Sequence, residues 1–219
     1  LIDDGADILD IGGESTRPGF AEVSEDEEIS RVVPLIQKIR QINDKIPISV
    51  DTRKMAVMKA AYENGADVLN DVSALEFDSK MADFISSTEL SVILMYWKSG
   101  AIKDAKKYLK ERVLFAQSCG IKKEKIILDP GIGFDKSFEE NCQLIKNCGD
   151  LAFGGIPVLM ALSNKRCIGA MINENEDSAK RGYGTACANL FAVESGAKII
   201  RVHDVKSAID SLNVMNFLK

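Results

Sequence analysis

The stretch ISVDTRKMAVMKAAYENG, residues 48–65, carries the pattern that decides the fold of this chain. It begins with an apolar run, residues 48–51, that ends in the carboxylate of Asp51 and has the length and β-branched content of a buried strand. A segment of helical period follows over residues 55–64, and Gly65 closes it in the way that glycine ends helices. A strand with a polar end followed by a helix is the repeating unit of parallel α/β proteins, so we expect that class here.

The same unit recurs along the whole chain. Apolar runs predict seven strands, and segments of helical period between them predict helices; Ser24 and Glu27 have the spacing of a capping box before the first of these helices. The predicted strands are residues 7–11, 48–51, 68–70, 92–95, 126–129, 158–161 and 199–203, and the predicted helices are residues 24–42, 55–64, 106–118, 138–146, 185–195 and 205–218.

Seven strands with helices between them fit either a doubly wound open sheet or most of an eight-stranded barrel. The glycine fingerprint of a dinucleotide-binding open sheet does not occur in the sequence, and the chain opens at Leu1-Ile2-Asp3-Asp4-Gly5, which has the composition of the last turn of a helix. We therefore expect a single (β/α)8 TIM-barrel domain over residues 1–219, with its first β-strand and most of its first helix absent from this sequence.

Composition argues against several classes of protein. The chain has 219 residues, of which 46% are hydrophobic and 28% charged, enough to bury the core of one domain. The formal net charge of −5 comes without a basic stripe, which argues against nucleic acid as a partner. No apolar run approaches the roughly 18 residues of a membrane helix and no secretory leader is seen, so we expect a cytoplasmic protein. The five cysteines, without a C-x-x-C pair, are interpreted as reduced packing residues.

Polar residues end one predicted strand after another. At the carboxyl ends of barrel strands the loops meet at one mouth, where functional groups gather. A polar group at the end of an apolar run is unfavourable to desolvate unless it binds a ligand or another group. A single one, such as Asp51, can equally be a helix cap, but several such strand ends together favour a binding site. The polar strand-end residues are Asp10, Asp51, Arg53, Asn70, Asp71, Asp129, Ser163, Lys165, Arg201 and His203.

These residue types suit a ligand that has a hydrogen-bonding edge and an anionic part. Carboxylates accept from N–H edges, whereas Arg and His donate to phosphate or diphosphate oxygens. His203, the one histidine of the chain, lies two positions after Arg201 on the same strand face, and it is either an anion clamp or a satisfied structural residue. The polar, glycine-flanked loop at residues 12–19 is predicted to be a mobile active-site loop, with an inert surface excursion as the alternative.

Six runs of the sequence together resemble dihydropteroate synthases. They are residues 10–19 (DIGGESTRPG), 48–54 (ISVDTRK), 70–73 (NDVS), 129–134 (DPGIGF), 163–166 (SNKR) and 201–204 (RVHD). GGESTRPG, DPGIGF and RVHD are specific in combination, whereas DTRK and NDVS alone are weak. The resemblance covers the chain from end to end. It implies a homodimeric (β/α)8 barrel, a transferase of folate biosynthesis and sulfonamide target that makes 7,8-dihydropteroate from 6-hydroxymethyl-7,8-dihydropterin diphosphate and p-aminobenzoate.

The resemblance also implies roles for single residues. Mg2+ is the implied cofactor, and it would help to stabilise the charge on the departing diphosphate. The family's asparagine contact to Mg2+ lies in the segment absent here, so no metal residue is assigned. The implied catalytic residues are Asp51, Lys165, Arg201 and His203; those for the pterin are Asp51, Asn70, Met95, Asp129, Phe134 and Lys165; those for the diphosphate are Arg17, Arg201 and His203; those for p-aminobenzoate are Thr16, Arg17, Pro18 and Ser163; and Asp10 is a supporting acid.

Two alternatives stay open at this point. A methyltransferase that passes a methyl group from methyltetrahydrofolate to a corrinoid protein shares the barrel and much of the pterin pocket. It has no diphosphate to hold, so Ser163 with Lys165, and Arg201 with His203, favour the synthase. A non-catalytic paralogue that binds pterin is supported by the absence of the first strand and its loop. The sequence also departs from the family at Asn164, where an arginine is usual, and we expect altered loop packing there without loss of the chemistry.

Overall fold

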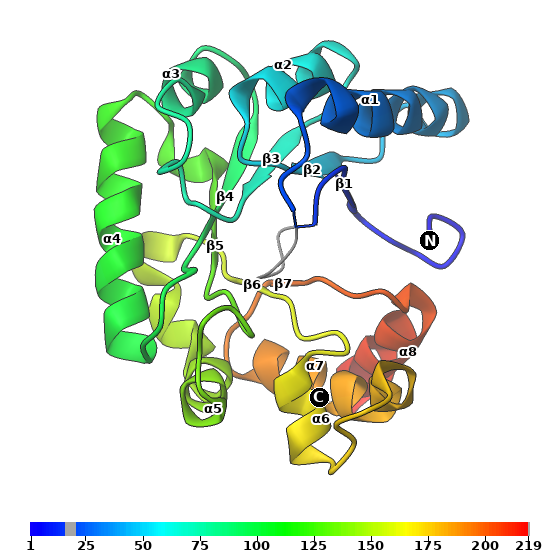
Figure 1. Ribbon diagram of the computed structural model, residues 1–219. Coiled ribbons are helices and arrows are strands. Elements are labelled where there is room, and N and C mark those ends of the chain that lie inside the picture. Colours follow the sequence, from blue (N-terminus) through cyan, green and yellow to red (C-terminus); the bar gives the residue numbers. More distant parts are fainter. Residues whose placement is uncertain (16–20, 219) are drawn as a thin grey trace. The chain divides into compact units, whose positions relative to one another are not determined.

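Strands and helices alternate along the chain in the computed structural model, which describes residues 1–15 and 21–218 (Figure 1). The strands are β1 (Leu9–Gly12), β2 (Ile48–Asp51), β3 (Val68–Asp71), β4 (Ser91–Met95), β5 (Ile126–Asp129), β6 (Leu159–Met160) and β7 (Ile199–Ile200). The helices are α1 (Glu25–Ile42), α2 (Met55–Glu63), α3 (Met81–Ser86), α4 (Ile102–Ser118), α5 (Phe138–Lys146), α6 (Arg166–Met171), α7 (Gly182–Glu194) and α8 (Val205–Phe217). Four short 3-10 turns lie at Lys123–Lys125, Cys148–Leu151, Phe153–Gly155 and Ser178–Arg181.

The chain divides into two compact units. The amino-terminal unit comprises Asp7–Tyr96 and Leu109–Ile127, and the carboxyl-terminal unit comprises Leu1–Ala6, Trp97–Tyr108 and Leu128–Lys219. Each unit has its own strands and its own apolar core, and each carries some of the predicted site residues.

A parallel sheet forms the centre of the amino-terminal unit. Its strands follow the order β1-β2-β3-β4-β5. Val50 lies beside Ile11 on one side and Leu69 on the other, and both Val50 and Leu69 are fully buried. Runs of Val, Ile and Leu suit such strands because helices cover a parallel sheet. Helices α1, α2 and α3 lie together along this sheet (Figure 1).

Helix α1 begins where the sequence predicts. The hydroxyl of Ser24 accepts a hydrogen bond from the backbone N–H of Glu27 over 3.3 Å, and the first turn is acidic, which suits the positive end of a helix. The buried residues of the helix recur at helical spacing and face the sheet; they are Glu28, Val32, Ile36 and Ile39. Glu28 is the exception to an otherwise apolar buried face.

The carboxyl-terminal unit aligns the ends of three parallel strands. Leu128 at the end of β5 bridges to Val158, and β6 pairs with β7 through Leu159 with Ile199 and Met160 with Ile200. Helices α5, α6, α7 and α8 pack around these strands (Figure 1). The loops that follow β5, β6 and β7 therefore start beside one another.

All seven predicted strands and all six predicted helices are present, so the parallel α/β class is confirmed. The sequence missed α3 and α6, which have six residues each and show too little periodicity. The predicted strand at residues 199–203 was wrong at its end, because β7 stops at Ile200. The backbone N–H of Arg201 still donates to the carbonyl of Met160 over 2.9 Å, but β6 ends there, so Arg201 and His203 lie in a loop and not on one strand face.

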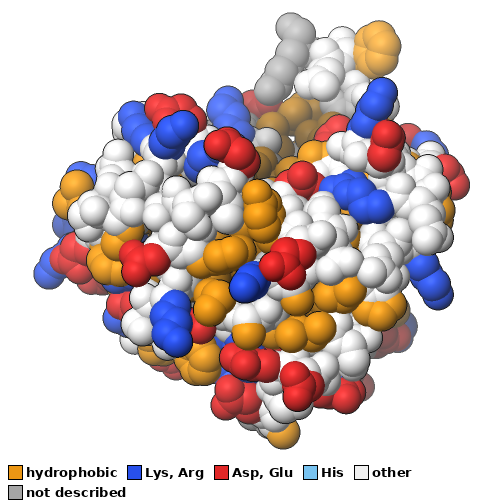
Figure 2. Space-filling view, turned by 90° about the horizontal axis from the view of Figure 1, so that it is seen from above, with side chains coloured by type: hydrophobic (Ala, Val, Ile, Leu, Met, Phe, Trp, Pro, Cys, Tyr) orange, Lys and Arg blue, Asp and Glu red, His pale blue; other side chains and the backbone are white. Residues whose placement is uncertain are grey.

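Two further predictions concern the surface and the cysteines. Acidic and basic side chains are interspersed over the face shown in Figure 2, with small apolar patches between them. All five cysteines are free; Cys148 and Cys167 are buried packing residues as predicted, whereas Cys187 is exposed. Within residues 1–15 and 21–218, none of the helices has the length and apolarity that crossing a membrane requires.

Candidate functional site

Neighbouring strands of the amino-terminal unit end in predicted site residues on one face of the sheet. Asp51 lies beside Asn70 in the β2–β3 register, and Asp10 is two positions before the partner of Asp51 on β1. Met95 is two positions after the partner of Asn70 on β4. Because side chains two positions apart share a face, all four side chains are on the same side.

Asn70 is the most buried polar residue of this set. It is 1% exposed, and its amide donates to Asp10 Oδ2 over 3.2 Å. Among the hydrogen bonds of the described residues, none reaches Asn70 Oδ1. A buried acceptor without a partner is unfavourable, so this oxygen is a position at which a ligand N–H would be stabilised.

Asp71 points to the opposite face and has a structural role. Its carboxylate accepts from the Ser73 N–H over 2.8 Å, the Ser73 hydroxyl over 2.6 Å and the Leu75 N–H over 2.7 Å. Burial raises the pKa of Asp71 despite these bonds. The turn it holds includes Ala74 and Leu75 at φ of 52° and 65°, so this strand-end acid shapes a strained turn instead of facing a ligand.

A buried ion cluster, formed by Glu14, Glu28, Arg53 and Lys54, joins the loops of the amino-terminal unit. Lys54 Nζ lies 2.7 Å from Glu14 Oε2 and 2.8 Å from Glu28 Oε2, and it also donates to the Val23 carbonyl. Arg53 Nη2 lies 3.3 Å from Glu14 Oε1. Burial alone lowers the pKa of Lys54, but its bonds to Glu14 and Glu28 outweigh burial, so that pKa is raised. For the same reason the pKa of Glu14 is lowered.

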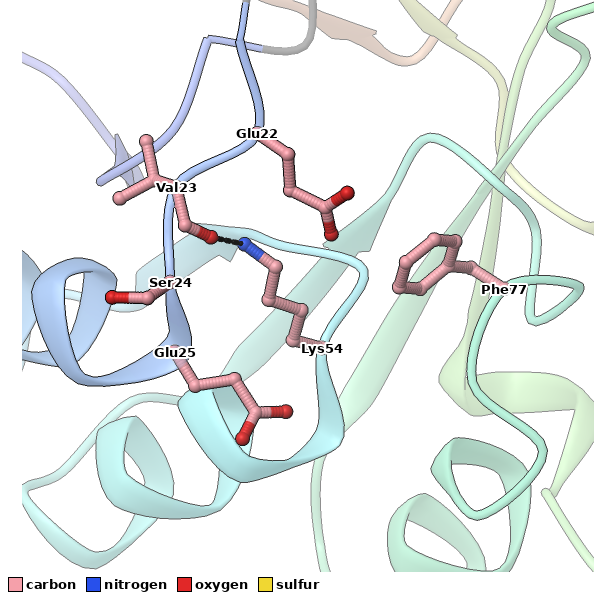
Figure 3. A pocket seen from close by; sticks show the side chains of 6 residues that line it. All are labelled: Glu22, Val23, Ser24, Glu25, Lys54 and Phe77. Atoms are coloured by element: carbon pink, nitrogen blue, oxygen red, sulfur yellow. Dashed lines mark hydrogen bonds between the residues drawn. The ribbon is translucent and has the colours of Figure 1, made fainter.

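This cluster borders a shallow depression of about 400 Å3 (Figure 3). Lys54 extends from the start of α2 toward the Val23 carbonyl, and Phe77 faces it from the other side. Arg53 stacks over the Phe77 ring, with 4.1 Å between its guanidinium carbon and the ring centroid. The remaining lining residues are Glu22, Ser24 and Glu25. Sequence analysis missed the cluster.

The carboxyl-terminal unit brings four predicted pterin and diphosphate residues into two contacts. Asp129, 1% exposed, accepts from the Gly131 N–H over 2.7 Å through Oδ1 and from Arg201 Nη2 over 3.3 Å through Oδ2. Lys165 Nζ lies 4.9 Å from the centroid of the Phe134 ring, within the range of a cation–π contact. A carboxylate, an aromatic ring and two cations therefore follow the ends of β5, β6 and β7.

Ser163 and His203 form a second polar pair in this unit. Ser163 Oγ lies 2.8 Å from His203 Nδ1 and 3.3 Å from the backbone N–H of His203, which donates to it. The imidazole is exposed, so His203 is not a buried structural histidine. Asp204, the last residue of the RVHD run, caps α8 by accepting from the Ser207 N–H over 3.0 Å.

Lys136 is a functional candidate that sequence analysis missed. Burial lowers its pKa to about 8, with the charge of Lys165 acting in the same direction and Asp129 among the acids that oppose it. Its ammonium donates to the Phe134 carbonyl over 2.9 Å. The only available signal was its position two residues after the DPGIGF run.

Some predicted site features stay without structural support. Thr16, Arg17 and Pro18, and with them the centre of the predicted mobile loop, lie outside the described residues. Within residues 1–15 and 21–218, no group of three or more His, Cys, Asp or Glu side chains could hold a metal ion.

Comparison with known proteins identifies the family. The family model described as "Pterin binding enzyme" matches residues 1–203. A dihydropteroate synthase of Streptococcus pyogenes serotype M3 is 40% identical over 223 residues, which cover 100% of this chain and 84% of the relative.

Solved structures agree with the sequence relatives. A dihydropteroate synthase of Xanthomonas albilineans with 4-aminobenzoic acid matches with a TM-score of 0.94 and 39% identity, over 99% of this chain and 81% of that one. The Xanthomonas albilineans enzyme with 7,8-dihydropteroate matches with a TM-score of 0.91 and 37% identity, over 99% of this chain and 83% of that one. These enzymes have the (β/α)8-barrel class that the sequence predicts. By its family model, its relatives and its fold, this chain belongs to the dihydropteroate synthases.

Proposed function

We propose that the chain is a transferase that joins 6-hydroxymethyl-7,8-dihydropterin diphosphate to p-aminobenzoate, giving 7,8-dihydropteroate and diphosphate. The observation that carries the proposal is the arrangement of Asp129, Arg201, Lys165 and Phe134 after the strands of the carboxyl-terminal unit. Its chemistry matches a flat heterocycle with N–H donors on one edge and an anionic group attached to it.

Asp129 is suited to the amino-pyrimidinone edge of the pterin. An ionised carboxylate has about four acceptor positions, and the bonds from Gly131 and Arg201 use two of them. The remaining positions accept from pterin N–H groups, while Arg201 compensates the buried charge. Phe134 offers its ring to a face of the pterin, and the ammonium of Lys165 donates to an acceptor of the ring system.

The reaction is a substitution at the exocyclic methylene of the pterin. The C–O bond to the diphosphate breaks with its electron pair on the departing oxygen, and the neutral amine of p-aminobenzoate forms the new C–N bond and then loses a proton. Arg201 and His203 stabilise the charge on the departing diphosphate. Ser163, hydrogen-bonded to His203 Nδ1, orients the imidazole, and the resemblance implies that it also lies near the p-aminobenzoate carboxylate.

The roles of the remaining residues rest on the resemblance. Asp51, Asn70 and Met95 are proposed pterin contacts, supported by their common face of the sheet and by the unpaired Oδ1 of Asn70 among the described hydrogen bonds. Asp10 supports Asn70 through the hydrogen bond between them. Thr16, Arg17 and Pro18 are proposed contacts to p-aminobenzoate, and Arg17 also to the diphosphate.

Mg2+ is implied by the family, but the residues that the structure describes do not fit a metal site of their own, since no acidic, histidine and cysteine cluster forms among them. We propose that Mg2+ binds together with the diphosphate of the substrate. Protein contacts to that diphosphate are assigned to Arg17, Arg201 and His203.

We also propose that two copies of the chain form a homodimer through α7 and α8. Helix α7 carries apolar residues on its outer side as well as on its buried side. On the outer side, Tyr183 is 92% exposed and Phe191 is 49% exposed. Phe217 at the end of α8 is 93% exposed. Exposed apolar side chains on neighbouring helices favour burial against a second copy. Sedimentation velocity should give a dimer that Phe191→Lys weakens and that Leu114→Lys, on α4, leaves intact; a monomeric wild-type protein would contradict the proposal.

A reducing compartment suits five free cysteines, and we propose the cytoplasm as the site of action.

His203→Ala tests the function most cleanly at the level of single residues. Arg201→Ala is a poorer test, because it also leaves the buried carboxylate of Asp129 without its cation. Loss of a hydrogen bond to a charged group costs about 1.5–3 kcal/mol, so His203→Ala should weaken binding of the pterin diphosphate about 10- to 100-fold. Calorimetry should show nearly unchanged binding of a pterin without diphosphate. Equal losses for both ligands would remove His203 from the diphosphate site.

A further inference from the structure

Asn141 is a buried polar residue that none of the assigned roles explains. It lies on α5, is 4% exposed and shares the buried face of the helix with Leu144 and Ile145. A carboxamide in such a place is unfavourable unless its donors and its acceptor are all satisfied. Its hydrogen bonds all go to the backbone at and just before the start of α5.

This carboxamide spans the loop between β5 and α5. Its Oδ1 accepts from the Gly133 N–H over 2.7 Å, and its Nδ2 donates to the carbonyls of Ser137 over 2.7 Å and of Lys136 over 3.3 Å. One side chain therefore fixes the loop on both sides of Phe134 and Asp135.

The loop needs such support because its backbone makes two tight turns and is strained at Asp135. Gly131 and Gly133 have φ of 66° and 84°, and Asp135 has φ of 41°, a conformation that residues with a Cβ rarely adopt. The Phe134 N–H donates to the Gly131 carbonyl over 3.1 Å, which closes the first turn. The Lys136 ammonium donates to the Phe134 carbonyl, which closes the second.

The side chain of Lys165 packs against the backbone of Gly133. A Cβ built on Gly133 would stand 3.3 Å from Lys165 Cδ and 3.8 Å from Lys165 Nζ, so the lysine side chain lies directly across this glycine. Beyond it the ammonium reaches the Phe134 ring at 4.9 Å. A shift of the Gly133 backbone would therefore move both the lysine stem and the ring beside it.

We propose that Asn141 is a positioning residue of the reaction. Its hydrogen bond fixes the position of the Gly133 backbone, and that position directs Lys165 and Phe134 toward the pterin. The inference rests on the proposed function, because it takes from there the roles of Lys165 and Phe134. Asn141 acts through Gly133 and touches no substrate. Loss of the Asn141 side chain should weaken binding of the pterin diphosphate and leave the KM for p-aminobenzoate unchanged.

Two substitutions separate positioning from folding stability. Asn141→Asp keeps an acceptor for the Gly133 N–H but points a carboxyl group at the Lys136 and Ser137 carbonyls, so it should destabilise the fold at least as much as Asn141→Leu. Asn141→Leu removes the Gly133 bond. Affinity for the pterin diphosphate should fall about tenfold in Asn141→Leu and stay within about twofold of wild type in Asn141→Asp, opposite to the order of stability.

Asn189→Leu is the matched control. Asn189 is a buried amide on α7 of the same unit and is 3% exposed. Among the described residues, no hydrogen bond joins it to the loop between β5 and α5. Calorimetric titration with the pterin diphosphate, steady-state KM for p-aminobenzoate and urea unfolding are measured for all variants. The control should bind the pterin like wild type, and the KM for p-aminobenzoate should not change in any variant.

The outcomes distinguish a failure of the role of Asn141 from a failure of the proposed function. Pterin affinity that follows stability through the series, or a tenfold loss in Asn141→Asp, overturns the proposal. If one of the two variants does not fold, the pterin affinity of the other variant, compared with that of Asn189→Leu, still decides the question. A wild-type protein that binds no pterin diphosphate would overturn the proposed function, and this inference with it. Wild-type binding with an unaltered Asn141→Leu would overturn only the role of Asn141.

Discussion

Replacing Lys54 by methionine should destabilise the fold severely, because its ammonium bridges two buried carboxylates, Glu14 and Glu28, and compensates their negative charge. The side chains of Lys54, Glu14 and Glu28 are 5%, 6% and 1% exposed. Removing one partner from a buried ion pair costs about 3–5 kcal/mol. A second estimate agrees, since two carboxylates about 5 Å apart repel by about 3 kcal/mol at an effective dielectric constant of about 20. We therefore expect Lys54→Met to lower the free energy of unfolding by about 3–5 kcal/mol at pH 7.5.

The pH dependence of this loss follows from the direction of each pKa shift. The pKa of Glu14 is lowered in the folded protein, so its stabilisation is present above its ordinary pKa and is lost as the pH falls through the lowered value. The pKa of Lys54 is raised, so its contribution is present below its ordinary pKa and is lost as the pH rises through the raised value. Without the lysine, Glu14 loses a bond that lowers its pKa and takes up a proton more readily, so the difference between variant and wild type should shrink from pH 7.5 to pH 5.

Urea unfolding at both pH values measures this effect. Lys59→Met, an exposed lysine on α2, is the matched control and should stay within about 0.5 kcal/mol of wild type. Adding Glu28→Gln to Lys54→Met should recover part of the loss, since it removes the charge of Glu28, which has lost its ion pair with Lys54. A Lys54→Met variant within about 1 kcal/mol of wild type at pH 7.5, or a loss that grows toward pH 5, would refute the reasoning.

Three further predictions concern the carboxyl-terminal unit. Gly133→Ala should destabilise the protein by about 1–3 kcal/mol in urea unfolding and weaken pterin binding in calorimetry, because its φ is 84° and its Cβ would press on Lys165. Asp129→Ala should cost about 1–3 kcal/mol of pterin binding, measured by the same titration, and unchanged affinity would remove Asp129 from the pocket. At pH 8, Lys136, with its pKa lowered to about 8, should hold about 100 times more of its amine in the neutral form than a lysine of ordinary pKa, so a limiting acetylating reagent should modify it faster per accessible amine; peptide mass spectrometry follows the rates, and equal rates would contradict the shift.

The strands could be predicted because most are short runs rich in Val, Ile or Leu, several of which end in a polar residue, and burial on both faces leaves little freedom in that pattern. The end of β7 could not be predicted, since Arg201 to His203 look extended in sequence and only the length of β6 decides that pairing stops at Ile200. The short helices α3 and α6 have too few turns to show a period.

The residue types at the strand ends indicated which residues belong to the site, but the sequence did not indicate which of these side chains contact one another. Asp129 and Arg201 are 72 residues apart in sequence, and Ser163 and His203 are 40 residues apart. Whether the members of each pair meet depends on the conformations of the loops that carry them. Lys54 and Glu14 read as ordinary surface charges in sequence, and their burial follows only from how α1 and α2 pack. Asn141 shows no sequence signal because its partners are backbone groups.

Diphosphate release tests the central claim most directly. The full-length protein is given 6-hydroxymethyl-7,8-dihydropterin diphosphate and Mg2+, with and without p-aminobenzoate, and diphosphate and dihydropteroate are quantified together. We expect diphosphate release to match p-aminobenzoate consumption and dihydropteroate formation one to one. Tight pterin binding without turnover, or methyl transfer from methyltetrahydrofolate instead, would contradict the account.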